Sequence, residues 1–188
     1  MGVTVTTPAA EDPVTLTEVK LHARIDISDD DAALQAMIQA ATEYVQAVSG
    51  RQMVAATMAE TFDRFCPVLP LARTPVTSIV SVTYLDENGD SQVVSSSIYK
   101  AILDRPIACV LRADGQSWPN THPDPNAVTV NYVAGYATAS AVPSSLRMLV
   151  KMIVADLYAH REANLESRVQ ENMTLRNLLW SQRVARIR

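Results

Sequence analysis

Glycine and cysteine are scarce in this sequence, and long apolar runs are missing. Its glycines, at positions 2, 50, 89, 115 and 135, form no glycine-rich loop that could cradle a phosphate. Cys66 and Cys109 lie far apart and without CxxC spacing, which argues against a zinc site or a redox motif. No apolar run approaches the ~20 residues of a membrane span. The N-terminus also lacks the features of a signal peptide, so we expect a soluble, intracellularly made protein.

Motifs of enzymatic chemistry are missing as well. His22, His122 and His160 fall in different predicted elements, and none has a second metal-ligand type at close spacing. The sequence contains no HExxH, G-x-S-x-G, phosphate loop or GxGxxG. His160 to Glu162 is an imaginable acid-base group, but we interpret it as the polar end of a helix. We therefore expect no enzyme activity, no catalytic residue, no metal site and no cofactor.

Charge is distributed unevenly along the chain. Residues 1–50 hold eight acidic side chains against Lys20 and Arg24, whereas residues 164–188 hold five arginines against two glutamates. Such an asymmetry indicates a tail that meets an acidic surface, on either a protein or a nucleic acid. A solvated, positively charged helix end is the simpler alternative.

Two helices are predicted over residues 15–50, after an N-terminal arm at residues 1–13 with little structure of its own. Thr15 and Glu18 have the spacing of a capping box. The second helix is expected to start at Ser28, with three aspartates in its first turn, and to end at Gly50. A cation site at these aspartates is the weaker interpretation, because the alternating ligands and the glycine turn of a calcium loop are missing.

From about residue 53 to 136 the apolar period changes from 3.6 to 2, which predicts a β insertion. Hairpins are expected around the turn at residues 86–90 and around residues 104–106. A further strand is expected at residues 128–133. The segment 115–126 is a loop by composition, and we expect Trp118 to anchor it. Together these strands predict a small antiparallel sheet or barrel-like module.

Val142 to Ala163 predicts a long helix that is apolar on two sides. Its first stripe is expected to face the core, and Pro143 suits the first helical position. The second apolar arc needs another partner, which we interpret as a neighbouring subunit; burial inside a single domain is the alternative. Core residues of the first stripe are Leu146, Leu149, Val150, Ile153, Val154 and Leu157, and predicted subunit contacts are Met148, Met152, Ala155 and Ala159.

Residues 164–188 form the predicted C-terminal docking tail. Leucine, tryptophan and arginine alternate there, and aromatic and arginine side chains dominate binding hot spots. Folding of this tail onto the chain's own helices is the alternative. The predicted docking residues are Arg176, Leu178, Leu179, Trp180, Arg183, Arg186 and Arg188.

These patterns predict an α+β fold: a helical bundle with a long C-terminal helix and an inserted small antiparallel β module. A connector domain is expected at residues 14–163, with helices at 15–50 and 143–163 and the β insertion at about 53–136.

The order of the sequence motifs along the chain resembles that of a known protein family. It runs VTLTEVKLHARID, AATEYVQAVSGR, SIVSVTYLDENGD, SSIYKAI, VTVNYVAGY, VPSSLRMLVKMIVADLYAHRE and LLWSQRVARIR. From Val14 on, this order resembles the head-tail connector, or adaptor, family of long-tailed bacteriophages and gene transfer agents.

The resemblance implies a structural subunit, made in the bacterial cytoplasm and located at the head-tail interface of the virion. It implies a ring of this chain, twelve-fold by expectation, between the portal protein and a tail-side stopper or tail-completion protein. DNA is expected to pass through the channel without specific binding, since acidic walls repel phosphate. No membrane contact is expected. The alternative is a nucleic-acid-binding module that uses the basic C-terminal arm, whose duplex affinity would fall steeply with salt.

Overall fold

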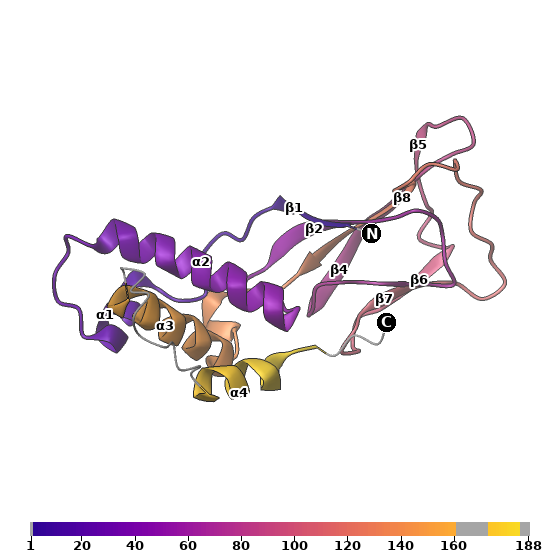
Figure 1. The fold of residues 1–188 in the computed structure, drawn as a ribbon. Coiled ribbons are helices and arrows are strands. Elements are labelled where there is room, and N and C mark those ends of the chain that lie inside the picture. The colour runs from indigo at the N-terminus through magenta and orange to yellow at the C-terminus, as the bar shows by residue number, and fades with distance from the viewer. Residues whose placement is uncertain (1, 161–172, 185–188) are drawn as a thin grey trace. The chain divides into compact units, whose positions relative to one another are not determined.

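The computed structural model describes residues 2–160 and 173–184, which fall into two compact units (Figure 1). The helical unit comprises residues 11–54 and 136–184 as far as they are described, and the β unit comprises residues 2–10 and 55–135. The chain therefore enters the β unit twice, once through its N-terminal strand and once between the second and third helices.

In the helical unit, all the helices contribute apolar side chains to one core. Contacts link α3 with each of the other three helices, and α2 also packs against α1 and α4. Buried residues recur at helical spacing, as in Leu34, Ile38, Ala41 and Val45 on α2. The elements are α1 (Leu16–Ala23), α2 (Asp31–Ser49), the 3-10 turn η1 (Ala139–Ala141), α3 (Ser144–Ala159) and α4 (Met173–Gln182).

Two antiparallel sheets make up the β unit. The five-stranded sheet has the order β1-β2-β8-β4-β5, and the three-stranded sheet has the order β3-β7-β6. Alternate residues of β2 and β8 are buried, as expected for strands that cover a core on one face. The strands are β1 (Gly2–Thr7), β2 (Ala56–Phe62), β3 (Val68–Pro70), β4 (Val76–Leu85), β5 (Ser91–Val93), β6 (Tyr99–Ile102), β7 (Cys109–Arg112) and β8 (Val128–Ala134).

The α+β class predicted from the sequence is confirmed. Both predicted hairpins are present, since β4 pairs with β5 and β6 with β7 in antiparallel fashion. The capping box is also present: the Thr15 hydroxyl accepts from the Glu18 N–H at 3.2 Å, and a Glu18 carboxylate oxygen accepts from the Thr15 N–H at 2.9 Å. Gly50 ends α2 in the left-handed conformation, with φ of 73°.

Several predicted boundaries differ from the structure. The arm expected at residues 1–13 contains β1, whose Val-Thr alternation is a strand pattern and whose backbone pairs with β2. Helix α2 begins at Asp31 instead of directly after Ser28, because residues 28–30 form a turn in which the Asp31 N–H bonds to the Ser28 carbonyl. Strand β3 was not predicted, since three residues are too few for a periodicity.

Helix α3 is shorter than expected. It spans 16 residues, fewer than the 19 of α2, and Pro143 is its N-cap, outside the first turn. The expected end at Ala163 lies outside the described residues. Four of the six predicted core residues of its first stripe are buried. Leu157 is 41% exposed and Ile153 only partly buried, because the stripe turns away from the core along the helix.

Candidate interaction surfaces

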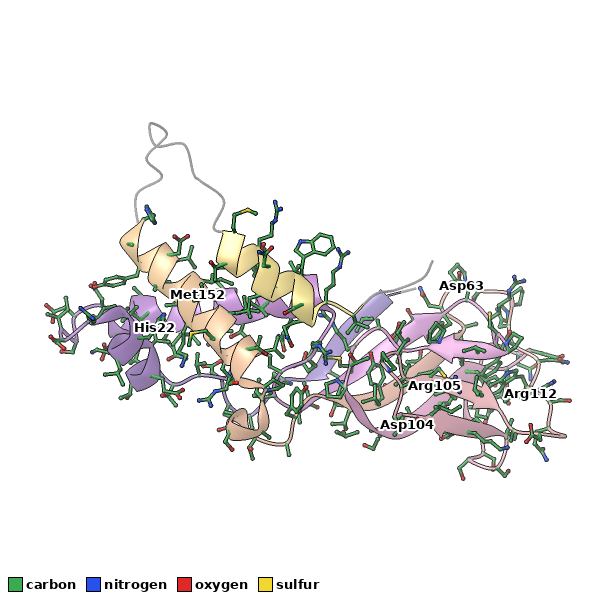
Figure 2. All side chains as sticks on the ribbon, turned by 90° about the horizontal axis from the view of Figure 1, so that it is seen from below. His22, Asp63, Asp104, Arg105, Arg112 and Met152 are labelled. Atoms are coloured by element: carbon green, nitrogen blue, oxygen red, sulfur yellow. The ribbon has the colours of Figure 1, made fainter. Side chains whose placement is uncertain are left out.

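The second apolar arc of α3 lies at the surface of the helical unit. Met148 is 39% exposed, Ala159 is exposed, and Met152 and Ala155 are partly buried. Figure 2 marks Met152 on this helix. The four predicted subunit contacts thus retain accessible surface, while the opposite side of α3 fills the core. An apolar arc of this kind provides non-directional contact area for another helix or chain.

Arg147 lies beside this arc and ties α3 to α1. Its guanidinium donates to Glu18 through Nη2 and to the Pro13 carbonyl through Nε at 3.1 Å. The hydrogen bond from the Thr15 N–H, followed by the Arg147 guanidinium, holds the pKa of Glu18 below its ordinary value of 4.5, against the opposing effect of burial. Sequence reasoning found the capping role of Glu18 but not its second partner, which is distant in sequence.

The acidic start of α2 makes contacts within the helical unit. Lys20 Nζ lies 2.7 Å from Asp31 Oδ1, and the Tyr158 hydroxyl donates to Asp30 Oδ2 at 2.8 Å. Asp30 is the N-cap residue but makes no side-chain capping bond. These carboxylates therefore link α2 to α1 and α3, and Asp30, expected in the first turn, is instead the N-cap residue.

Helix α4 packs onto the helices of its own unit. Leu179 is its buried side chain, at 6% exposure. Two hydrogen bonds hold the end of α4 and the segment that follows: Arg51 Nε donates to the Gln182 carbonyl at 2.9 Å, and the Val184 N–H donates to the Ser49 carbonyl at 2.9 Å. The alternative left open by the sequence, a tail that folds back onto its own helices, therefore holds for residues 173–184.

The opposite side of α4 is open to solvent and carries several predicted docking residues. Trp180 is 63% exposed, and the Arg183 guanidinium carbon lies 5.2 Å from the centroid of its ring. Arg176 is exposed and Leu178 partly buried. We call Arg176, Trp180 and Arg183 the α4 patch. Arg186 and Arg188 lie outside the described residues.

A buried carboxylate is the main ionisable feature inside the β unit. Glu60 on β2 is 0% exposed, and its Oε2 accepts from the Tyr132 hydroxyl at 3.0 Å and from the Ala72 N–H at 2.7 Å. Burial, followed by the Glu60 carboxylate, raises the pKa of Tyr132 well above 10.0. Sequence reasoning missed Glu60, although its position between Met58 and Phe62 in a period-2 strand was a usable signal.

The loop at residues 115–126 is anchored by Trp118, as predicted. Its indole stacks on Phe65 at 4.5 Å between ring centroids, and its Nε1 donates to the Cys66 carbonyl at 3.1 Å. A cavity of about 460 Å³ adjoins this loop, where His122 Nδ1 lies 3.2 Å from Asp124 Oδ2. Figure 2 marks Asp63, another lining residue, which accepts a hydrogen bond from the Asn126 N–H.

No group of three or more His, Cys, Asp or Glu side chains within residues 2–160 and 173–184 is placed to hold a metal ion. Across the same residues, no helix combines the length and the apolarity needed to cross a membrane.

Comparison with known proteins gives a family model that matches part of the chain and solved structures that share its fold. The family model for phage gp6-like head-tail connector protein matches residues 13–84, which include α1, α2, β2, β3 and most of β4. The resemblance inferred from the sequence is thereby confirmed. A search of curated protein sequences finds no match.

Similar solved structures come from gene transfer agent (GTA) particles. A chain in the virion of a native particle has a TM-score of 0.81 at 20% identity. A chain in the neck of a native particle, computed with C12 symmetry, has a TM-score of 0.80 at 17% sequence identity. A chain in the neck of an empty particle, computed with C6 symmetry, has a TM-score of 0.79 at 19% sequence identity. Each comparison covers 100% of this chain and 97% of the other, so the fold is shared along the whole length.

Proposed function

Since residues 13–84 match the phage gp6-like head-tail connector family, we propose that this protein is a structural head-tail connector subunit of a tailed phage or gene transfer agent. In this proposal it forms a ring under the portal, extends the DNA channel and joins the head to the tail. The observation that carries the proposal is the combination of this family match with a fold shared, over the entire chain, with proteins of GTA necks.

The proposed ring has twelve copies and lies at the head-tail interface of the particle. A similar chain is found in a neck computed with C12 symmetry, which supports this number. Portal protein on the head side, and a stopper or tail-completion protein on the tail side, are the proposed partners. The role is structural and not enzymatic, with DNA passing through the channel without specific contacts.

Each part of the chain has a place in this proposal. The helical unit is a bundle that includes α3, residues 55–135 of the β unit are inserted between α2 and α3, and residues 164–188 are the docking tail. Contacts between subunits are assigned to Met148, Met152, Ala155 and Ala159, which keep accessible surface on α3. The portal-facing surface is assigned to the α4 patch, with Arg186 and Arg188 beyond it.

A nucleic-acid-binding module remains the weaker candidate. Arg183, one of the arginines it would need, lies over the Trp180 ring. The eight acidic residues within positions 1–50 would also repel the phosphate backbone.

Portal binding by variants of α4 tests the proposal. Trp180→Ala combined with Arg183→Ala should weaken co-purification with portal rings at least tenfold and leave the unfolding midpoint unchanged, because both side chains are exposed. Leu179→Ala is the matched comparison on the buried side of the same helix. It should lower stability by about 2 kcal/mol or more through the cavity it leaves. Undiminished portal binding by the double variant would contradict the assigned docking surface.

A further inference from the structure

We propose that neighbouring copies of this chain join edge to edge, with β1 of one copy pairing with the open edge of β4 in the next. The five-stranded sheets would then continue from subunit to subunit. This inference rests on the proposed ring and names a contact additional to the apolar arc of α3.

Strand β1 is an edge strand that carries no charged residue and no proline, and its pairing with β2 is interrupted by one register shift, between Val5 and Thr7. It ends the order of the five-stranded sheet (Figure 1), and all six of its residues are exposed. Natural edge strands commonly carry lysine, proline or an inward-pointing charge that prevents pairing with other chains. The sequence GVTVTT has none of these and is rich in residues that favour strands.

The valines of β1 lie on the same face of the sheet as the buried residues of β2, but they are themselves only partly covered by the rest of the chain. Val3 pairs with Glu60 and Val5 with Met58, both of which are buried on β2. Side chains of paired residues point to the same face of a sheet. Val3 and Val5 nevertheless remain 38% and 52% exposed, so apolar area is available at this edge for a further strand.

Strand β4 has an open edge of matching length. On the side away from β8, β5 pairs only with Thr83–Leu85, and the Val94 N–H bonds to the Val82 carbonyl. In the described part of the chain, no strand pairs with the outer side of residues 76–81. This stretch has six residues, as β1 has, with register shifts against β8 at Thr77 and at Val80, and Val80 is 59% exposed.

Strand direction makes the two edges compatible. Each neighbouring pair in the order β1-β2-β8-β4 is antiparallel, so β1 and β4 of one copy run in opposite directions. A second copy in the same orientation therefore presents its β1 antiparallel to β4 of the first, and the antiparallel pattern continues. Because unlike edges meet, the contact is heterologous, which is the type that generates closed rings. Addition of a strand to an open edge is a recurrent mode of recognition.

Disulfide cross-linking between copies tests this contact. In a Cys66→Ala background, chains with Thr4→Cys are mixed with chains with Ser78→Cys and allowed to form rings, alone or on portal. Both positions pair with partly exposed residues on the outward face of the sheet. Oxidation should produce covalent dimers in the mixture and none in rings of either variant alone. Thr6→Cys and Ser81→Cys, combined in the same way, cover neighbouring registers.

A charge at the edge provides a second test. Val5→Lys should reduce ring formation at least tenfold while the circular dichroism spectrum of the monomer stays unchanged. Val68→Lys, which alters a 47% exposed valine on β3, is the matched control and should assemble normally. Rings of the cysteine variants that form but give no cross-link in any combination, or Val5→Lys rings that form normally, would overturn the edge contact alone. Wild-type protein that forms no ring, even with portal, would contradict the proposed function instead.

Discussion

At the scale of single residues, Glu18 connects local and tertiary structure through one carboxylate. Its two oxygens accept from the Thr15 N–H and from Arg147, so it caps α1 and links α1 to α3. Because its folded pKa lies below the ordinary value of 4.5, its stabilisation is complete above that pH and is lost as the pH falls through the folded pKa.

Replacement of Glu18 by glutamine should therefore have a pH-dependent effect. We expect Glu18→Gln to lower the free energy of unfolding by up to about 1 kcal/mol at pH 7, because glutamine can keep the capping hydrogen bond but loses the charge that pairs with Arg147. The difference from wild type should shrink as the pH falls below 4.5, where the wild-type carboxylate becomes protonated. Urea unfolding at a series of pH values measures this. Glu43→Gln, at an exposed position on α2, is the control, and a pH-independent difference for Glu18→Gln would contradict the account.

The buried pair of Glu60 and Tyr132 leads to a second prediction. Tyr132→Phe removes a hydrogen bond donor from a carboxylate that is shielded from water, so we expect a loss of about 1 to 3 kcal/mol in unfolding free energy. Tyr84→Phe, at a partly exposed position on β4, should change stability far less. Thermal unfolding of both variants measures the difference, and equal midpoints would show that the Tyr132 hydroxyl contributes no net stability.

At the scale of elements, local patterns predicted the helices and strands that are long and periodic. The buried positions of α2 and the capping box at Thr15 follow from helical spacing and cap chemistry, which operate within a few residues. The hairpin of β6 and β7 follows from two apolar runs around one turn. The start of α2 was misplaced because residues 28–30 form a turn that the Asp31 N–H and the Ser28 carbonyl close. The contacts of Asp30 with Tyr158 and of Asp31 with Lys20 are ones that no local pattern reveals.

Strand pairing and side-chain contacts between residues far apart in the sequence could not be predicted from the sequence. Strand β1 precedes β2 by about fifty residues, and its pairing depends on a tertiary arrangement that propensity does not encode. For the candidate surfaces, the sequence named the apolar arc of α3 and the docking residues of α4. It left open whether α4 packs on its own helices, which Leu179 and the Arg51 bond to the Gln182 carbonyl now settle for residues 173–184.

The apolar arc of α3 leads to a prediction at this scale. Met152→Glu with Ala155→Glu should prevent ring formation and leave a folded monomer, because both side chains keep accessible surface and a buried charge at a subunit contact is strongly unfavourable. Size-exclusion chromatography with circular dichroism measures both properties. Lys151→Glu, on the flank of the same helix, is the control. An unfolded double variant would assign this arc to the internal core.

At the scale of the whole molecule, two compact units share one chain, and each has its own accessible surface. The helical unit presents the α3 arc and the α4 patch, and the β unit presents the edges of β1 and β4. A subunit of a closed ring needs two different contact surfaces, one for each neighbour, and further surfaces for its partners in the particle. In the proposed ring the α3 arc and the edges of β1 and β4 face neighbouring copies, and the α4 patch faces the portal.

The mass of the assembled protein tests the central claim most directly. Native mass spectrometry of the purified chain, alone and mixed with portal rings, measures how many copies associate. The connector account predicts a species that contains about twelve copies of the 20.5 kDa chain when portal is present. A chain that stays monomeric with portal, and instead binds duplex DNA, would contradict the account and favour the nucleic-acid-binding alternative.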